Sequence, residues 1–486
     1  MPYSHASKDL NRARDRVAEA GGRELLDRLD HLDARRSAGR PALSIPKAPD
    51  SKARPDYDVA FVGGGLSLLI AALLARRGAK VAVFERATAG VVHREWNASV
   101  AELEALVRCG LFTAAEVEGL TVTTYDYGFC QWFGGGRYPV EGVLDTPVDA
   151  GRLLIAARAK AEESGVEFYD NHSLIGHAEG LSSVNLRFKS GRSTREVSAT
   201  LFVDARGASS PYAIADLLCP TVGGVLQGLD RGDAPRSINP RVGEILVTTE
   251  HVEDGRQHIW EAFPGRPDHT TVYLFYYAPS DRVREGALVE LYDRFFDTLP
   301  HYKTGDFTLA RPTFGLIPGW SRLSPAPRPP GSRVALVGDA AARHSPLTFC
   351  GFGSMLRSLE PASRRILAAL DAPTLRPGDL DCVVSDSPVH AGTGLLASMM
   401  ANPDLEAGKE DRINTLLEAA FATLYELGDD VYAALLKDEI SMKDFAWFLH
   451  LTSLKRPRVY RDVFGKFGAR HVARWGVSIA RGIAGV

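Results

Sequence analysis

The sequence is poor in cysteine, and its cysteines are widely spaced. Five occur in 486 residues, and no two of them form a CxxC motif. Disulfide scaffolds and structural zinc sites both need cysteines in close pairs. The scatter therefore excludes these two classes, and we predict no metal site and a reducing compartment. The cysteines are Cys109, Cys130, Cys219, Cys350 and Cys382.

Long apolar runs are also missing. The N-terminal stretch "MPYSHASKDLNRARDRV" is polar, and the Arg35-Arg36 pair is not followed by the apolar stretch of a twin-arginine signal. The longest uncharged run, 59–75, approaches the roughly 18 residues of a membrane span, but three consecutive glycines interrupt it. We expect a cytoplasmic protein in which no helix crosses a membrane.

The sequence also lacks a large excess of positive or negative charge. Lys and Arg together number 57 and Asp and Glu 60, which gives a formal net charge of -3. Such a balance provides no overall attraction to nucleic acid, so we predict no nucleic-acid partner. A hydrophobic content of 45% over this length suffices for a large core.

The stretch "YDVAFVGGGLSLLIAALLARRGAKVAVFER", residues 57–86, predicts a strand, a glycine turn, a helix and a second strand. Glu85 ends the second strand, where its carboxylate can accept hydrogen bonds from a ribose, and the helix N-terminus can receive a pyrophosphate. Leu68 stands where the usual fingerprint has its third glycine, which implies wider packing of helix against strand. The pattern predicts a dinucleotide site.

Two further glycine and acid sites follow strand-like runs. "VDARG" contains Asp204 and Gly207, and "VGDAAARHSP" contains Asp339. The order of the three sites resembles that of flavoprotein hydroxylases, which bind FAD. The resemblance implies that Asp339 accepts hydrogen bonds from the ribityl chain, whereas the alternative is an Asp that only caps a helix.

The predicted FAD contacts come from all three sites, from an arginine before a predicted helix and from the glycine-rich start of a late helix. They are Gly63, Gly64, Gly65, Glu85, Arg86, Arg94, Asp204, Gly207, Gly338, Asp339, Pro346, Gly351 and Gly353.

We predict an α/β fold in which a Rossmann-like FAD-binding domain is interleaved with an antiparallel-sheet substrate domain, followed by C-terminal helices. The segments are a helical arm at 1–37 broken at Gly21-Gly22, a linker at 38–56, the FAD-binding domain at 57–124, 148–220 and 331–372, the substrate domain at 125–147 and 221–330, and the helices at 373–486. A helix at 288–299 is followed by a proline-rich passage to Gly331, to which we assign no element.

Four stretches carry a closer resemblance that, with the helical arm, extends over nearly the whole chain. They are "REWNAS" with the following "AELEALVRCGLF", "IWEAFPGRPDHTTVYLFYY", "FGLIPGW", and "GDAAARHSPLTFCGFGSMLRSL". They resemble the CruA/CruP type of lycopene cyclases. The resemblance implies an enzyme that closes the ends of lycopene into β-rings without net oxidation, with FAD in its reduced form.

Such chemistry needs an acid that protonates a terminal double bond. Glu261 is our first candidate because it lies between Trp260 and Phe263 in a predicted strand, where burial would raise its pKa. The alternative is an edge-strand carboxylate paired with Arg266 in solvent. Glu95 is the second candidate, either as an acid or as the residue that orients Arg94 on the FAD pyrophosphate.

His344 is a third candidate, either as a proton relay near the flavin or as a residue that holds its loop. Aromatic side chains can stabilise a carbocation through their π faces, although such a stripe is more often core. The candidates are Trp132, Phe133, Trp260, Phe263, Tyr273, Phe275, Tyr276 and Tyr277.

One departure from the wider superfamily bears on the reaction. Better-known cyclases carry an acidic pair in the strand that reads "VYLFYY" here, and this strand has no acid. Two rival functions stay open: a flavin monooxygenase or halogenase that consumes NAD(P)H and oxygen with a small organic substrate, and a non-catalytic protein that binds flavin or carotenoid. For a cyclase, NAD(P)H would serve only as a transient electron donor.

The C-terminal stretch from Lys455 is basic, with eight Lys and Arg residues and a single acid, Asp462. Phe464, Phe467, Trp475, Ile479 and Ile483 recur at helical spacing. A basic amphipathic helix of this kind suits an anionic membrane surface, and the alternative is a helix packed on the body with a solvated basic face. The expected partners are thus a polyene or another small molecule and, through this helix, a membrane surface.

Overall fold

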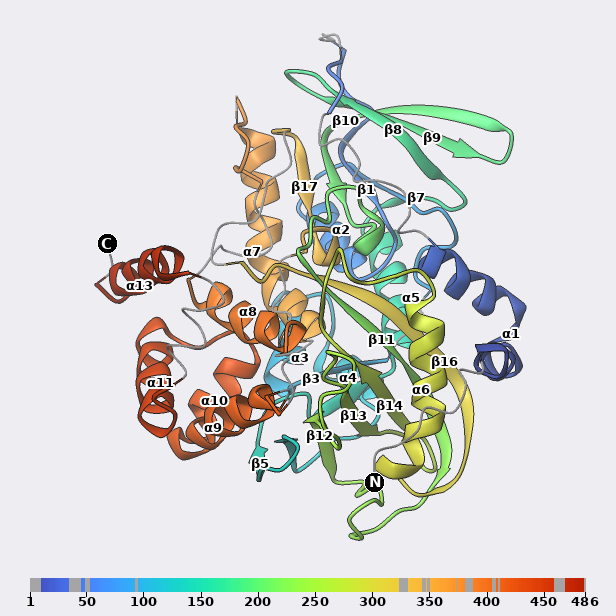
Figure 1. Ribbon diagram of the computed structural model, residues 1–486. Coiled ribbons are helices and arrows are strands. Elements are labelled where there is room, and N and C mark those ends of the chain that lie inside the picture. The colour runs from blue at the N-terminus through green and yellow to red at the C-terminus, as the bar shows by residue number, and fades with distance from the viewer. Residues whose placement is uncertain are drawn as a thin grey trace.

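The computed structural model describes residues 10–34, 45–48, 53–91, 95–322, 331–342, 347, 350–372, 374–380, 388–403, 408–409, 411–458 and 468–484. Within them, two large sheets stand one above the other (Figure 1), with helices packed on the faces of both. No helix in these ranges combines the length and the hydrophobicity that a bilayer crossing requires.

The first sheet has the strand order β7-β2-β1-β10-β9-β8, with β17 beside β10. Strands β1, β2, β7, β10 and β17 are parallel, and β8, β9 and β10 form an antiparallel extension. The strands are β1 (Tyr57–Val62), β2 (Val81–Phe84), β7 (Glu167–Tyr169), β8 (Ser173–Glu179), β9 (Val184–Ser190), β10 (Ser193–Asp204) and β17 (Val334–Leu336).

Helices cover the parallel part of this sheet, as apolar strands buried on both faces require. A continuous apolar cluster joins the strands to these helices and includes Val59, Leu69 and Met355. The helices are α2 (Ser67–Arg76), α3 (Val100–Arg108), α4 (Ala114–Leu120), α5 (Ala150–Glu163) and α7 (Gly351–Asp371).

The second sheet has the order β15-β11-β14-β13-β12-β4-β5, with β16 paired to β11. Its strands are β4 (Tyr127–Gln131), β5 (Arg137–Val140), β11 (Leu217–Leu229), β12 (Val242–Val247), β13 (Ile259–Pro264), β14 (Thr270–Phe275), β15 (Ala278–Pro279) and β16 (Gly305–Gly319). Outside both sheets, β3 (Trp96–Ala98) pairs with β6 (Thr146–Val148).

The proline-rich passage differs from its sequence interpretation. Fifteen of its residues form β16, which runs along most of β11. Pro312 and Pro318 are tolerated there because β16 pairs with β11 alone, and an edge strand does not need every backbone N–H.

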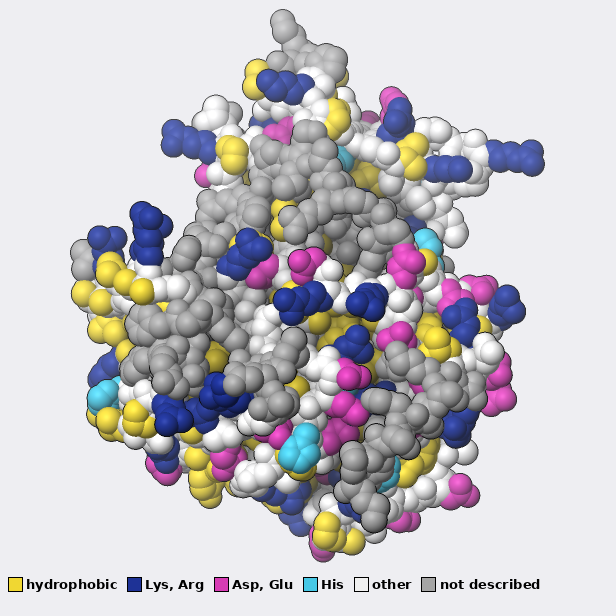
Figure 2. All heavy atoms as spheres, viewed as in Figure 1, with side chains coloured by type: hydrophobic (Ala, Val, Ile, Leu, Met, Phe, Trp, Pro, Cys, Tyr) yellow, Lys and Arg dark blue, Asp and Glu magenta, His cyan; other side chains and the backbone are white. Residues whose placement is uncertain are grey.

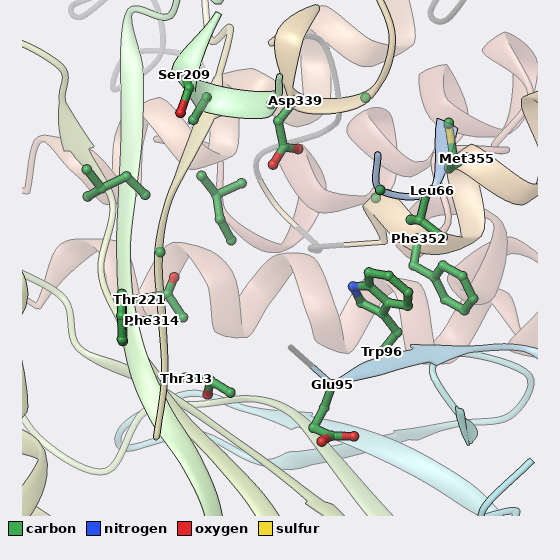
Figure 3. A pocket seen from close by; sticks show the side chains of 18 of the residues that line it. Leu66, Glu95, Trp96, Ser209, Thr221, Thr313, Phe314, Asp339, Phe352 and Met355 are labelled. Atoms are coloured by element: carbon green, nitrogen blue, oxygen red, sulfur yellow. The ribbon is translucent and has the colours of Figure 1, made fainter. Parts of the chain in front are cut away.

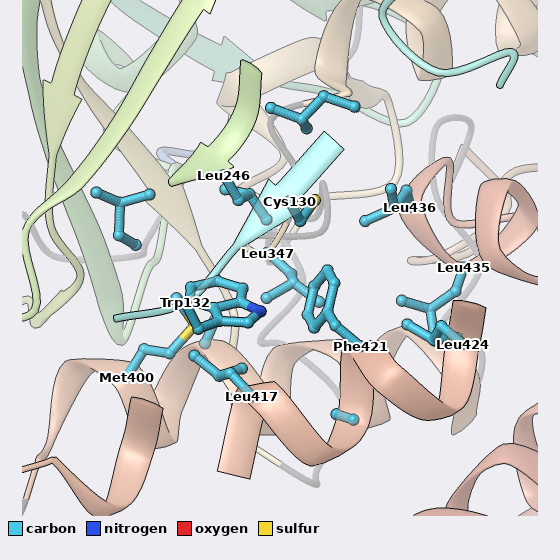
Figure 4. Packing of buried hydrophobic residues seen from close by; sticks show 14 of the residues in the cluster. Cys130, Trp132, Leu246, Leu347, Met400, Leu417, Phe421, Leu424, Leu435 and Leu436 are labelled. Atoms are coloured by element: carbon cyan, nitrogen blue, oxygen red, sulfur yellow. The ribbon is translucent and has the colours of Figure 1, made fainter. Parts of the chain in front are cut away.

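Different helices cover the two faces of the second sheet (Figure 1). On one face lie α6 (Ala287–Tyr302) and the arm helix α1 (Leu10–Ala34). The other face is covered by the C-terminal helices α8 (Pro388–Ala401), α9 (Arg412–Leu427), α10 (Asp429–Leu436), α11 (Met442–Lys455) and α13 (Ala469–Ala484). Figure 4 shows the core of this second contact, where Phe421 of α9 meets the buried Trp132 edge-on at 5.0 Å.

The arm helix α1 is kinked at Gly22, where φ is 74°, as the Gly21-Gly22 pair predicts. A buried carboxylate at its C-terminal end anchors it to the body. Asp33 accepts hydrogen bonds from the backbone N–H groups of Leu288, at 3.0 and 3.1 Å, and Val289, at 3.2 Å. These N–H groups belong to the first turn of α6, so a residue far away in sequence caps that helix.

Removing this cap should destabilise the protein. We expect Asp33→Ala to lower the free energy of unfolding by about 1–2 kcal/mol, because the first N–H groups of α6 lose their acceptor. Denaturant unfolding measures the change. Asp27→Ala, which removes an exposed carboxylate from the same helix, is the control and should change stability by less than about 0.5 kcal/mol. Equal effects of the two substitutions would contradict the anchoring role.

Candidate functional site

A cavity of about 470 Å³ lies where the two sheets meet. Figure 3 shows its walls, with the long strands β11 and β16 on one side and the start of α7 on the other. The glycine turn after β1, the loop after β10 and residues of β13 and β14 complete the lining. One partly open space is therefore bordered by both sheets.

The three glycines after β1 have different tasks. A Cβ atom on Gly63 would lie 2.3 Å from the carbonyl oxygen of Ala205, and a Cβ atom on Gly64 would lie 2.4 Å from the Cβ of Ala89. These two glycines permit close packing of the chain. Gly65 has open space around it and lines the cavity.

Glu85 is held by backbone donors beside this turn. Its carboxylate accepts hydrogen bonds from the N–H groups of Gly64, at 2.9 Å, and Ala87, at 3.0 Å. A carboxylate has about four acceptor positions, so capacity for a ribose remains. Arg86 lines the cavity, and no described side chain caps the N-terminus of α2 beside it. This end of the cavity thus presents a cation and a helix N-terminus, which suit a phosphate.

Asp204 builds the neighbouring loop and does not line the cavity. It is fully buried, forms an ion pair with Arg206 at 2.7 Å and accepts a hydrogen bond from the Ser210 hydroxyl at 2.6 Å. The loop that it fixes, 205–209, faces the cavity and includes Gly207. A positive φ of 61° at Gly207 accounts for the glycine.

The third glycine and acid site follows β17. Gly338 has a φ of 60°, and Asp339 comes directly after it. In Figure 3 the Asp339 carboxylate points into the cavity, as a ribityl-binding role requires.

Helix α7 begins at the cavity, where Gly351 and Phe352 form part of the lining. No described side chain caps this helix N-terminus, whose backbone N–H groups give it a partial positive charge. Trp96 stacks on Phe352 with ring centroids 5.2 Å apart. Gly353 faces away, because a Cβ atom there would lie 2.1 Å from a carboxylate oxygen of Glu102.

Glu261 lies in the apolar part of the cavity wall. It is 6% exposed on β13, an interior strand, and no described residue makes a hydrogen bond to its Oε1. The predicted alternative of a solvent pair with Arg266 is wrong, since Arg266 pairs with Asp149. Burial raises the pKa of the Glu261 carboxyl well above its usual value.

The surroundings of Glu261 are aromatic and weakly polar. Tyr273 stands directly opposite it on β14, and Phe263, Phe275 and Thr221 share the cavity wall. Cys130 lies close behind, and burial raises the pKa of its thiol to about 12. Among the described residues no cation pairs with Glu261, so burial shifts the carboxyl toward its neutral form, which can donate a proton.

Two other catalytic candidates have different outcomes. Glu95 lines the cavity and forms an ion pair with Arg311 of β16, so the structure gives it a strand arginine as partner. Arg94, its predicted partner, lies outside the described residues, as do His344 and Pro346.

The predicted aromatic set is divided between two faces, because side chains alternate along a strand. Phe263, Tyr273 and Phe275 face the cavity. Trp260 and Tyr276 face α6, and Trp260 stacks on Tyr302 at 4.8 Å. The others lie elsewhere: Trp132 and Tyr277 pack in the core under the C-terminal helices, and Phe133 contacts His251.

The sequence interpretation missed part of the lining. Arg28, His31 and Leu32 of α1 reach the cavity, and so does the stretch 313–317 of β16. The β16 residues carried a signal in the apolar run "FGLIPG", but their position opposite β11 depends on long-range pairing.

Comparison with known proteins adds information about the fold. The sequence matches no protein-family model and no curated protein. Solved structures do match. Halogenase PltM covers 88% of this chain and 96% of its own with a TM-score of 0.57 and 14% identity. A further structure of that halogenase, with a TM-score of 0.55 and 14% identity, covers 88% of this chain and 91% of its own and contains phloroglucinol and FAD.

Two other matches have different activities. OxyS anhydrotetracycline hydroxylase from Streptomyces rimosus has a TM-score of 0.55 at 18% identity, over 79% of this chain and 76% of its own. A geranylgeranyl bacteriochlorophyll reductase-like protein from Thermoplasma acidophilum has a TM-score of 0.51 at 14% identity. The match covers 84% of this chain and 98% of that protein. The chain has the fold of flavoprotein hydroxylases and halogenases. The predicted α/β fold class is thereby confirmed.

A buried neutral carboxyl makes stability depend on pH. Above about pH 4.5 the unfolded chain releases the Glu261 proton while the folded chain retains it, so this residue lowers stability as pH rises. We expect the free energy of unfolding of Glu261→Gln, relative to the unmodified protein, to increase by up to about 2.5 kcal/mol between pH 5 and pH 7, the value reached when the folded chain stays protonated throughout.

Urea unfolding at the two pH values measures this difference. Glu285→Gln, which changes an exposed carboxylate, is the control and should show a shift of at most a few tenths of a kcal/mol. A pH-independent effect of Glu261→Gln would show that the carboxyl is ionised in the folded protein.

Proposed function

We propose that the chain is an FAD-dependent enzyme whose cofactor occupies the cavity between the two sheets. The observation that carries this proposal is the convergence of Gly65, Arg86, Asp339 and the N-terminus of α7 on one space. Arg86 and the start of α2 would hold the pyrophosphate, Asp339 the ribityl hydroxyls, and the positive end of α7 would face the isoalloxazine ring. The matched halogenase structure that contains FAD supports the same assignment.

The proposed substrate is an apolar polyene, and the proposed reaction is the cyclisation of its end group, as the resemblance to CruA/CruP-type cyclases implies. Two features of the site support it. Burial raises the pKa of the acid beside the cavity and so favours its neutral form, and the wall around it is formed by Phe263, Tyr273 and Phe275.

Glu261 would act as the general acid. It would donate its proton to the terminal double bond, and the neighbouring double bond would attack the resulting carbocation to close the ring. The Glu261 carboxylate would then take a proton from a carbon adjacent to the new cation, which regenerates the acid. The sum is an isomerisation in which nothing is oxidised or reduced. The faces of Tyr273 and Phe275 stabilise the cation while it exists. FAD bound in its reduced form would supply a negative charge nearby, with NAD(P)H as the transient donor of its electrons.

A second candidate function is a flavin monooxygenase or halogenase with a small organic substrate. The observation that favours it is the shared fold with a halogenase and a hydroxylase, each matched over most of this chain. That reaction would consume NAD(P)H and oxygen in step with product, whereas cyclisation needs only catalytic reduction of the flavin. A chain that binds flavin or polyene without turnover is the remaining alternative.

Cofactor binding should depend on Asp339. We expect Asp339→Ala to weaken FAD binding by about tenfold or more, since hydrogen bonds to a charged acceptor contribute about 1.5–3 kcal/mol. Flavin fluorescence after heat release measures FAD content. Asp306→Ala, at the distal end of β16, is the matched control and should retain FAD. Equal FAD content in both variants would place the ribityl chain elsewhere.

Cyclisation should depend on Glu261. In cells that accumulate lycopene, we expect the unmodified protein to form cyclic carotenoid and Glu261→Gln to form none while it retains FAD. Pigment chromatography measures both results, and Glu285→Gln should remain active.

The outcomes separate the candidate functions. Unchanged lycopene in the presence of flavin-loaded protein would overturn cyclisation. Consumption of NAD(P)H and oxygen in a fixed ratio to a new product would then support the monooxygenase or halogenase reaction. An active Glu261→Gln variant would remove this residue from the acid role.

A further inference from the structure

The C-terminal helix α13 uses its apolar side to pack on the body. Trp475 and Ile479 are 8% and 7% exposed, and the Trp475 ring meets Phe445 of α11 edge-on at 6.1 Å. These residues belong to the set that the sequence assigns to a membrane-facing side. Phe464 and Phe467 of that set lie outside the described residues. Ile483 of the set is 49% exposed, so the body covers this side at Trp475 and Ile479, and the side opposite these two residues is the exposed one.

That opposite side carries a stripe of arginines. Arg470, Arg474, Val477 and Arg481 follow one another at spacings of four, three and four residues, which places them along one line of a helix. All four are exposed. Helix α13 contains no acidic residue. Figure 2 shows Lys, Arg and hydrophobic side chains together at the edge of the molecule where Figure 1 places α13.

The residues beside the stripe are small. Ala473, Gly476, Ala480 and Ala484 are all exposed. With so little side chain between them, the arginines can reach a flat surface together while the helix lies parallel to it. A row of cations on a smooth helix face is the arrangement of helices that lie on a bilayer.

An exposed apolar side chain lies within the stripe itself. Val477, between Arg474 and Arg481, is 52% exposed. An aliphatic side chain of this kind inserts at the headgroup level of a bilayer, while arginines bind the phosphates.

We propose that the arginine stripe of α13, Arg470, Arg474 and Arg481, docks the protein on the surface of an anionic lipid bilayer. Charge complementarity supports this occupant, because the chain as a whole has a net charge of -3 and this helix has only cations among its ionised groups. The docking is peripheral, and it does not depend on the reaction proposed for the cavity.

Co-sedimentation with vesicles tests the proposal. Full-length protein is mixed with vesicles of phosphatidylcholine alone, or with vesicles that also contain about 30 mol% phosphatidylserine. On such an anionic surface each nearby Lys or Arg contributes about 1 kcal/mol to binding. The test variant changes Arg470, Arg474 and Arg481 to Ala. The control changes Arg187, Lys189 and Arg192 to Ala, three exposed cations of the β9–β10 hairpin, so that both variants have the same net charge.

We expect the unmodified protein and the hairpin variant to bind anionic vesicles, and the stripe variant to bind at least about tenfold more weakly. Binding should be lost on neutral vesicles and at high salt. Thermal unfolding of the stripe variant confirms that it is folded, which a truncation of α13 would not ensure because Trp475 belongs to the core.

Three results would overturn the proposal. They are equal binding of both variants to anionic vesicles, no binding of the unmodified protein to anionic vesicles, and self-association that the stripe variant abolishes while vesicle binding is unchanged. The last result would assign the face to a second copy of the chain.

Discussion

The site depends on the parallel alignment of strands that are far apart in the sequence. Val62 at the end of β1 lies beside Phe84 of β2 and Asp204 of β10, and Asp204 lies beside Leu336 of β17. Because parallel strands end at the same edge, the turns that follow them must meet there. This single constraint brings together the glycine turn after β1, Glu85, the loop after Asp204 and the Gly338-Asp339 pair. No local feature of any of these segments would have done so.

The second sheet adds a reactive group to this edge at a cost in stability. A buried carboxylate without a partner is unfavourable, and burial accordingly raises the pKa of Glu261, which favours its neutral form. The strand that carries it is fixed from both sides, since β12 and β14 flank β13 and Trp260 on the other face packs against α6. The rigid position and the apolar surroundings have the same origin, namely an interior strand between two helical layers.

Local patterns in the sequence predicted those parts of the molecule that short-range rules determine. The βαβ unit, the hairpin turn at Ser190-Gly191 and the kink at Gly21-Gly22 follow from glycine positions and apolar periodicity, and the structure contains all three.

The pairing of β11 with β16 was missed because prolines suppress the strand signal and only an edge position permits them. The cap of α6 by Asp33 could not be predicted either, because more than 250 residues separate donor and acceptor. Ion pairs between residues far apart in the sequence could not be predicted either. Examples are the pairs of Glu95 with Arg311 and of Arg266 with Asp149.

Long-range packing, which the sequence does not reveal, also decides which side of α13 is buried. An amphipathic sequence identifies an apolar side but does not say whether protein or lipid covers it. Here the cover is protein: Trp475 and Ile479 belong to one contiguous apolar cluster that also includes Phe263 and Phe275 of the cavity wall. The C-terminal helices are therefore the outer layer over the sheet face that carries Glu261. A bilayer bound to the arginine stripe would lie against this layer, so an apolar substrate from the membrane would have to pass around or between helices whose packing also holds the acid in place.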